Sequence, residues 1–206
     1  LKVGLLGAGY IARWHADALK RVKGARLAGV CDLSAKAAQE LARATGARVY
    51  ASLDEMLGDG FDCIHLLTPP HAHFEPLKRI LSARVAAFVE KPFVLSSAEA
   101  RELCALAADR RVALGVNHNF LMLPAYDRLK ADIASGVIGP IDSLQANWRF
   151  TLPPLRSGPY ELWMLRAPQN ILFELGPHLF AFVADLLGDM RVGDVRLRYP
   201  IEIPGG

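Results

Sequence analysis

The sequence predicts an α/β fold in which a doubly wound parallel sheet is followed by a partial α/β domain of the antiparallel-sheet type. Six short apolar runs alternate with helical segments over residues 1–117, and a glycine-rich turn follows the first run. Short apolar strands with helices between them pair in parallel and are buried on both faces. The hydrophobic fraction of 52% and the charged fraction of 22% are those of a globular chain and exclude a disordered one.

The six strands and the helices between them follow from local signals. Strands are expected over Lys2–Leu6, Arg26–Cys31, Arg48–Tyr50, Asp62–Leu67, Val85–Glu90 and Val112–Val116. Helices are expected over Ile11–Val22, Ser34–Thr45, His71–Ser82 and Ser96 to about Arg110, with a short helix from Ser52. Ser34 is a candidate N-cap, and Ser52 and Ser96 each precede a glutamate by three residues, which is a capping box.

The second half of the chain has a different pattern. Helices are expected over Pro124–Ser135 and Asn170–Leu187, and strands over Ile141–Phe150 and Val192–Tyr199. Two strands do not form a stable open sheet by themselves. We therefore expect a first domain over residues 1–117 and only part of a second domain over residues 118–206.

Charge and hydropathy narrow the classes of partner. The net charge is +3, and no basic stripe with interleaved aromatic residues occurs, which argues against a nucleic-acid partner. No apolar run approaches the roughly 20 residues that span a bilayer, so no membrane partner is expected.

Cysteines and histidines give no metal-binding pattern. The three cysteines are far apart and have no ligand spacing, which favours a reduced, cytoplasmic location. His71 and His73 have an H-x-H spacing, but no third ligand lies nearby in the sequence, so no metal is expected. His15 is expected to take part in helix packing.

Residues 7–12, GAGYIA, form a G-x-G-x-x-A turn between the first strand and the first helix. Gly7 permits the tight turn, and Gly9 lets the backbone approach a pyrophosphate. The first N–H groups of the helix, at Tyr10 and Ile11, would then attract the phosphates. This context is typical of a Rossmann-type dinucleotide site, and a plain strand-to-helix turn is the alternative.

Asp32 follows the second strand, 20 residues after Ala12. A carboxylate at that place accepts hydrogen bonds from the adenosine ribose and repels a 2′-phosphate, so NAD is expected rather than NADP. Lys36 and Arg13 are near enough in the sequence to weaken this preference. The alternative role for Asp32 is that of a helix N-cap, and the two roles can coexist.

Four further segments carry a family likeness: LLTPPHAHFEPLKRIL (66–81), VAAFVEKPFVLSSAEA (85–100), SGVIGPIDS (135–143) and NILFELGPHLFAFVADLLG (170–188). Together with the glycine turn, they resemble the Gfo/Idh/MocA family of NAD(P)-dependent oxidoreductases over nearly the whole chain. The resemblance implies an N-terminal Rossmann domain and a C-terminal domain with a large open antiparallel sheet, of which this chain would hold only a part. It also implies a cofactor at the carboxyl ends of the strands and a substrate between the domains.

The resemblance and the strand ends together indicate the cofactor side of the site. The residues expected to bind the cofactor after the fourth and fifth strands are Thr68, Pro69, Glu90 and Lys91. The resemblance implies that Lys91 is a catalytic cation beside nicotinamide and substrate, and that Pro92 follows a cis or otherwise constrained peptide. Glu90 is either a cofactor-side acid or a partner that positions Lys91. A surface lysine in a turn is the alternative for Lys91.

A family motif near the start of a helix has an acid, then a glycine two residues on and a histidine four residues on. Glu174, Gly176 and His178 match this spacing, which puts the acid and the histidine on one helix face. His178 is expected to carry the alcohol proton while hydride moves, and a core histidine is the alternative. The family acid is usually aspartate, and the extra methylene of Glu174 moves its carboxylate by about 1.5 Å. Glu174 therefore either touches the substrate or orients His178.

Three further residues are candidates for substrate contact. Many relatives carry an arginine near Asn119, so its amide favours neutral polar substrates, and a satisfied inter-domain loop is the alternative. Trp163 and Arg166 precede the helix of His178 and either contact the substrate or pack.

The expected function is that of an NAD(P)-dependent dehydrogenase, which transfers hydride between nicotinamide and a hydroxyl carbon of a sugar, cyclitol or similar polyol-like substrate. Lys91 would polarise the oxygen, His178 would carry the proton and Glu174 would orient His178. The resemblance also implies a homo-oligomer, a dimer or a tetramer. The alternative is a non-catalytic NAD(P)-binding regulator or scaffold of the same fold.

Overall fold

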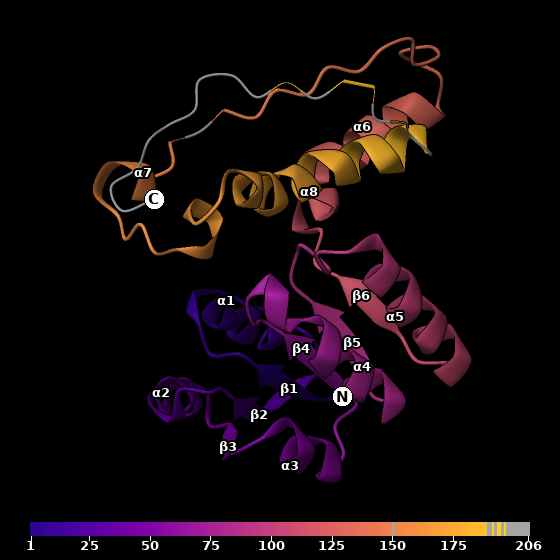
Figure 1. Cartoon of the computed structure of the whole chain (residues 1–206). Coiled ribbons are helices and arrows are strands. Elements are labelled where there is room, and N and C mark those ends of the chain that lie inside the picture. The colour runs from indigo at the N-terminus through magenta and orange to yellow at the C-terminus, as the bar shows by residue number, and fades with distance from the viewer. Residues whose placement is uncertain (150, 189–190, 192, 195, 197–206) are drawn as a thin grey trace. The chain divides into compact units, whose positions relative to one another are not determined.

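The computed structural model describes residues 1–149, 151–188, 191, 193, 194 and 196. The chain divides into two compact units, which are Leu1–Asn117 and the residues from His118 onward (Figure 1). Every strand of the described residues belongs to the first unit.

The first unit is built on a single parallel sheet. Its strand order is β3-β2-β1-β4-β5-β6, and every neighbouring pair is parallel. The strands are β1 (Lys2–Leu6), β2 (Arg26–Cys31), β3 (Arg48–Tyr50), β4 (Cys63–Leu66), β5 (Ala86–Val89) and β6 (Leu114–Val116). The predicted doubly wound sheet is therefore confirmed, and each strand lies within its expected range. The order reverses between β1 and β4, which is the place where such sheets bind ligands.

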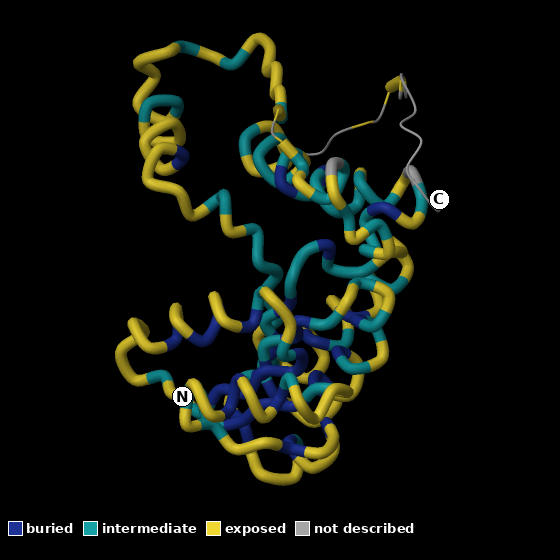
Figure 2. Tube along the Cα trace, turned by 90° about the vertical axis from the view of Figure 1, so that its left-hand side faces the viewer, coloured by how far each residue is buried: buried dark blue, intermediate teal, exposed yellow. Residues whose placement is uncertain are grey.

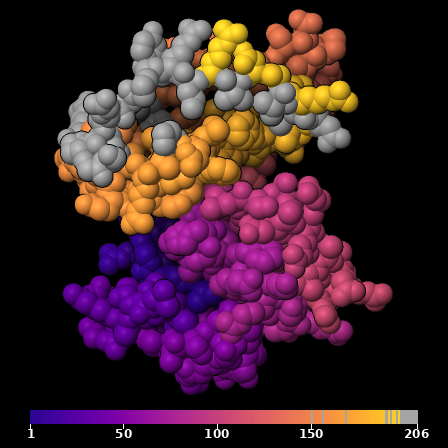
Figure 3. Space-filling view, viewed as in Figure 1, coloured from indigo at the N-terminus to yellow at the C-terminus, as the bar shows by residue number. Residues whose placement is uncertain are grey.

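Helices cover both faces of this sheet. They are α1 (Tyr10–Leu19), α2 (Ala35–Thr45), α3 (Leu53–Gly58), α4 (Phe74–Ser82) and α5 (Ser97–Arg110). Val3 and Leu5 of β1 share a core with α1 and α2, whereas Leu6 shares a second core with α3, α4 and α5. Because successive side chains of a strand point to opposite faces, the two groups of helices lie on opposite sides of the sheet. Burial is concentrated in the strands and the inner helix faces (Figure 2), and side chains fill the spaces that the ribbon leaves open (Figure 3).

The starts of the helices differ in how their backbone N–H groups are satisfied. Serine caps begin α2, α3 and α5, as the sequence predicts. The hydroxyl of Ser52 accepts the N–H of Glu55 at 3.2 Å, but the Glu55 carboxylate accepts the N–H of Ala51 and leaves the capping box open. Helix α1 has neither a side-chain cap nor an acidic residue in its first turn. No side chain of the helix itself therefore offsets the positive end of its dipole.

Two glycines in neighbouring strands make room for aromatic rings in the core. Gly4 of β1 lies opposite Gly29 of β2 in the sheet. A Cβ atom at Gly29 would lie 2.5 Å from the ring of Tyr50 and 2.7 Å from the ring of Phe61, which are both buried. The rings thus occupy the space that side chains at these two positions would otherwise take.

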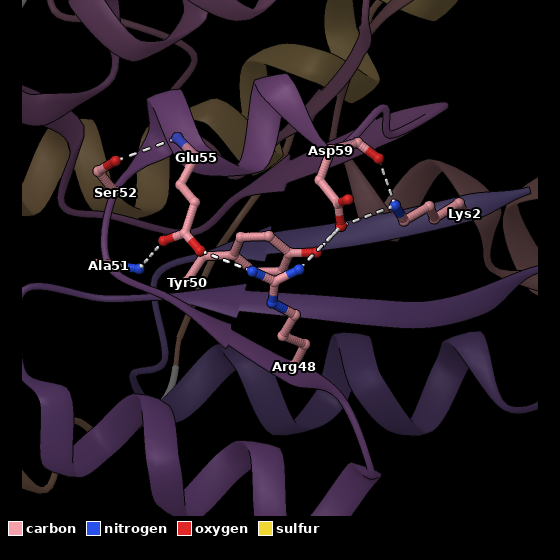
Figure 4. A network of polar contacts seen from close by, with 7 residues as sticks. All are labelled: Lys2, Arg48, Tyr50, Ala51, Ser52, Glu55 and Asp59. Carbon is pink, nitrogen blue, oxygen red and sulfur yellow. Dashed lines mark hydrogen bonds and ion pairs between the residues drawn. The ribbon is translucent and has the colours of Figure 1, made fainter.

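A polar network holds the edge strand β3 (Figure 4). Asp59 accepts a hydrogen bond from the Tyr50 hydroxyl and forms an ion pair with Lys2 at 3.1 Å. Arg48 pairs with Glu55 at 2.9 Å. Burial and the hydrogen bond to Asp59 both raise the pKa of the Tyr50 hydroxyl. Exposed ion pairs of this kind contribute little energy each, so their effect is to fix the place of a strand that is only three residues long.

The second unit is helical among the described residues. Its elements are the short 3-10 helices η2 (Asn119–Met122) and η3 (Trp163–Leu165), and the α-helices α6 (Pro124–Ala134), α7 (Pro154–Ser157) and α8 (Pro168–Leu187). The strand expected over Ile141–Phe150 is wrong over residues 141–149, which are not in a strand. A strand needs a partner, and the other strand expected in this half of the chain, Val192–Tyr199, lies outside the described residues except for 193, 194 and 196. The expected antiparallel sheet is therefore not present among them.

Helix α8 is apolar and largely unburied. Over Gln169–Leu187 its mean hydropathy is 1.3, and 11% of this stretch is buried within the structure. By length and composition alone it is long and apolar enough to cross a membrane, so the expectation of no membrane partner stays a prediction. Asp185 of α8 accepts a hydrogen bond from Tyr126 at 2.7 Å and pairs with Lys130 at 2.8 Å, so polar contacts join α8 to α6.

Candidate active site

The glycine turn is packed on one side and open on the other. Gly7 has a φ of +109°, and a Cβ atom there would lie 2.8 Å from the carbonyl group of Leu67. A Cβ atom at Gly9 would meet no atom within 4 Å, so the backbone at Gly9 is approachable from outside. Tyr10 and Ile11 begin α1, and their N–H groups belong to the first turn, which has no acceptors within the helix. The turn thus combines an approachable backbone, N–H donors and the positive end of a helix dipole. These are the features that bind an anion such as a pyrophosphate.

Asp32 joins the glycine turn to the start of α2. One carboxylate oxygen accepts the N–H of Ala8 at 2.6 Å, and the other accepts the N–H of Ser34 at 2.7 Å. The N-cap of α2 is Ser34, not Asp32, because the Ser34 hydroxyl accepts the N–H of Ala37. Each carboxylate oxygen has two lone pairs, so Asp32 retains capacity to accept bonds from ribose hydroxyls. The next residue, Leu33, is fully exposed and apolar, so it offers no positive charge for a 2′-phosphate next to Asp32.

The segments that follow β4 and β5 are tied together by a buried histidine. One ring nitrogen of His73 lies 2.8 Å from the carbonyl oxygen of Thr68, and the other lies 2.9 Å from that of Phe93. His71, in contrast, is exposed, so the H-x-H pair does not form one site. Pro69 is exposed between Thr68 and the 3-10 helix η1 (Pro70–Ala72). Within the described part of the chain, no three histidine, cysteine, aspartate or glutamate side chains are grouped as a metal site.

The carboxylate of Glu90, the residue before Lys91, is held by a network of hydrogen bonds. Its Oε1 atom lies 2.5 Å from the Asn117 amide nitrogen and 3.0 Å from His15 Nε2, and its Oε2 atom accepts the backbone N–H of Lys91 at 3.2 Å. Burial acts to raise the pKa of the Glu90 carboxyl, but the hydrogen bonds from His15 and Asn117 and the charges of His15 and Lys91 outweigh it and lower the pKa. Of the two roles left open for Glu90, this geometry favours the positioning of Lys91. The Lys91–Pro92 peptide is cis, as the resemblance implies.

Sequence reasoning missed two members of this network and misjudged a third. Asn117 was not a candidate, nor was His65, whose Nδ1 atom lies 3.0 Å from Nδ1 of His15. His15 was expected only to pack. A signal existed for His15, because it lies on the face of α1 that buries Ala12, Ala16 and Leu19. A histidine among buried apolar residues needs a polar partner, and that partner is Glu90.

In the second unit, α8 carries Glu174 and His178 one turn apart. His178 is buried, lies edge-on to Phe120 with ring centroids 4.5 Å apart, and stacks on Trp148 at 5.7 Å with an interplanar angle of 8°. Sequence reasoning did not single out Trp148. An aromatic wall of this kind fixes the plane of the imidazole ring.

The other predicted substrate residues lie in the short elements of this unit. Asn119 begins η2 and is exposed. The carbonyl group of Trp163 accepts a hydrogen bond from Asn170 at 2.7 Å. Exposed Arg166 donates its Nε–H to the carbonyl group of Glu161 at 2.8 Å. These bonds to the local backbone are compatible with either of the roles predicted for Trp163 and Arg166.

Comparison with known proteins identifies the family. A family model described as an oxidoreductase family with an NAD-binding Rossmann fold matches residues 1–118. The chain belongs to the Gfo/Idh/MocA family. Inositol 2-dehydrogenase of Rhizobium meliloti is 30% identical, over 93% of this chain and 56% of that protein. D-apiose dehydrogenase of Paraburkholderia graminis is 28% identical, over 92% of this chain and 50% of that protein. The chain thus spans about half the length of the curated relatives it matches.

Solved structures of Gfo/Idh/MocA type agree with the fold. GenD2 from gentamicin A biosynthesis, in complex with NAD, matches with a TM-score of 0.75 and 28% identity, over 91% of this chain and 54% of that one. UDP-N-acetylglucosamine 3-dehydrogenase of Acidithiobacillus ferrooxidans matches with a TM-score of 0.60 and 32% identity, over 63% of this chain and 42% of that one. The family model is NAD-binding, and the open turn at Gly9 and the carboxylate of Asp32 fit the pyrophosphate and ribose of that cofactor.

Gly9→Val is expected to weaken NAD binding by at least about 10-fold without loss of stability. A Cβ atom at this position would meet no atom within 4 Å, but the side chain would stand where the pyrophosphate must approach the backbone. Titration calorimetry with NAD, together with thermal unfolding, measures both properties. Gly58→Val at the end of α3 is the control, because its Cβ position is equally open and lies outside the glycine turn. Equal NAD affinity in Gly9→Val and the native protein would contradict the assignment.

Proposed function

We propose that this protein is an NAD-dependent dehydrogenase that acts on a hydroxyl carbon of a sugar, cyclitol or similar polyol. The observation that carries the proposal is the rim of the first unit, where the open glycine turn, Asp32 and the Glu90–Lys91 step follow β1, β2 and β5. Relatives of the chain are dehydrogenases of inositol and of D-apiose, which are small polyhydroxylated molecules. Cys31, Cys63 and Cys104 are free thiols, which supports a cytoplasmic location.

In this proposal Gly9 and Asp32 would hold NAD at the rim of the first unit, and the bound cofactor would supply the hydride acceptor for the substrate carbon. Lys91 holds a positive charge at the end of β5 and stabilises the oxygen as its charge develops. His178, whose ring plane is fixed by Trp148 and Phe120, takes the hydroxyl proton, and Glu174 orients it from the preceding turn of α8. Asn119, Trp163 and Arg166 contribute polar contacts to the hydroxyl groups of the substrate.

A substrate panel tests the proposal. The protein is mixed with NAD and, in turn, with inositol isomers, D-apiose, glucose and glucose 6-phosphate, and absorbance is followed at 340 nm. Growth of NADH absorbance with one of these polyols is the expected result. Tight NAD binding without turnover of any of them would instead favour the alternative of a cofactor-binding regulator.

NAD is expected to bind at least about 10-fold more tightly than NADP. The charge of Asp32, held by the N–H groups of Ala8 and Ser34, repels a 2′-phosphate. Asp32→Asn removes the charge but keeps an acceptor oxygen, so the ratio of the two dissociation constants should fall toward one. Asp109→Asn, near the carboxyl end of α5, is the control and should leave the ratio unchanged. Tighter binding of NADP than of NAD to the native protein would refute the preference.

A further inference from the structure

Two histidines extend the Glu90 network into the sheet. His15 of α1 is buried, with Nε2 3.0 Å from Glu90 Oε1 and Nδ1 3.0 Å from Nδ1 of His65 in β4. The two imidazole rings meet edge to face with centroids 5.2 Å apart, and the ring of Phe88 packs against both. A continuous line of polar contacts thus runs from Asn117 and Glu90 through His15 to His65.

The hydrogen-bond chemistry of this line restricts where its protons lie. The Glu90 carboxyl is held in its ionised form, which only accepts, so His15 Nε2 carries a hydrogen atom and donates it. Between the two facing Nδ1 atoms there is room for one hydrogen atom, so one ring donates and the other accepts. Burial, with a smaller effect of His15, lowers the pKa of His65 to about 4, so His65 is neutral near pH 7.

Two arrangements satisfy all of these bonds, and they differ by one proton. In the first, both rings are neutral, and His65 Nδ1–H donates to His15 Nδ1. In the second, a proton from solvent is bound at His65 Nε2, the shared proton has moved from His65 Nδ1 to His15 Nδ1, and His15 is an imidazolium beside the Glu90 carboxylate. No hydrogen bond between the residues is lost in the change, and no electrons are transferred.

We propose that His15 and His65 form a positioning pair. The pair transfers one proton to Nδ1 of His15, whose other ring nitrogen is bonded to Glu90, and thereby sets the net charge next to Lys91. The role in catalysis rests on the proposed dehydrogenase function, whereas the proton arrangement does not. When His15 is neutral, Lys91 faces the full negative charge of Glu90, which also accepts its backbone N–H. When His15 is charged, it pairs with Glu90 and offsets part of that negative charge. Among the described residues, Glu90 is the charged group bonded to the pair. Lys91 acts on Glu90 through its charge, and Asn117, after β6, gives Glu90 a neutral donor.

Nuclear magnetic resonance of the full chain labelled with 15N-histidine tests the proton arrangement without any substrate. At pH 8 we expect His65 as the Nδ1–H tautomer and His15 as the Nε2–H tautomer. On acidification, His15 should gain its second proton in the same pH step in which His65 changes to the Nε2–H tautomer. His71→Gln, which removes an exposed imidazole, is the control and should leave these signals in place. The Nε2–H tautomer of His65 at pH 8 would overturn the proposal.

The pH profile of kcat/KM separates a positioning role from a merely structural one. In His65→Leu the second N–H of a charged His15 has no acceptor, so the step in the profile should move to lower pH by about one unit or more. In His65→Asn the amide restores a hydrogen-bond partner for His15 Nδ1, and the step should return toward that of the native protein. Identical profiles for the native protein and both variants would overturn the role at Lys91. Absence of turnover together with the expected tautomers would count against the dehydrogenase function and leave the histidine pair standing.

Discussion

Lys91→Ala is expected to lower kcat by about 100-fold or more, which corresponds to about 2.7 kcal/mol of transition-state stabilisation. The side chain follows β5 at the rim of the sheet and is only partly buried, so its removal should leave the melting temperature and the affinity for NAD nearly unchanged. Steady-state kinetics with the substrate found in the panel, together with NAD titration, measure both. Lys23→Ala, an exposed lysine after α1, is the control and should keep the native kcat.

His178→Ala is expected to have an effect of the same size for a different reason. It removes the group that takes the hydroxyl proton, and general acid–base catalysis is worth about 100-fold to 10,000-fold. His178 packs against Phe120 and Trp148, so its replacement by alanine leaves a space between them. His178→Gln is therefore a second variant, because glutamine fills more of that space. Glu174→Asp tests the role of the acid. A strong loss of kcat indicates that the longer side chain orients His178, and an unchanged kcat indicates that either acid suffices. Native kcat in both Lys91→Ala and His178→Ala would reject the catalytic assignment and favour the regulator.

Gly7→Ala is expected to have the largest effect on stability, a loss of at least about 3 kcal/mol. The residue has a φ of +109°, and an added Cβ atom would lie 2.8 Å from the backbone of Leu67. Leu67 directly follows β4 and donates its N–H to the carbonyl group of Leu6 in β1, so its backbone cannot turn aside as a side chain can. Gly24→Ala is a matched control, because Gly24 has a φ of +83° but no atom within 4 Å of its Cβ position. It should lose only the conformational cost, about 1–2 kcal/mol.

Urea unfolding of the two variants measures their stabilities, and the difference between them isolates the steric clash with the backbone of Leu67. If Gly7→Ala is no less stable than Gly24→Ala, the turn relaxes around the methyl group, and the close packing between the glycine turn and Leu67 is not a constraint on the fold.

The first unit was predictable because its signals are local. Each buried strand is a short apolar run, and each is followed by a residue that ends it, such as Gly7 or Asp32. The common place of the candidate cofactor residues was predictable for the same reason, since parallel strands bring their carboxyl ends to one rim. The cis peptide before Pro92 came from the family resemblance and not from any local signal.

What could not be predicted depends on partners that are distant in the sequence. His15 and Glu90 are 75 residues apart, and nothing in the alternation of strands and helices indicates that they meet. The alternating pattern of residues 141–149 predicts a strand, but backbone groups form a ladder only when a neighbour is in register, and the described residues provide none. Trp148 lies in this segment, and its stacking on His178 could not be predicted from the sequence either.

The facing glycines of β1 and β2 have a consequence for how this family can vary. A Cβ atom at Gly29 would meet Tyr50 and Phe61, and one at Gly4 would meet Met56 and Phe61, so the five positions form a single volume rather than separate sites. Interiors are close-packed, and a methyl group added at position 29 must be matched by smaller residues at positions 50 and 61. In descendants of this sequence, these positions should therefore change together or not at all, although residues 29 and 61 belong to segments that no sequence pattern connects.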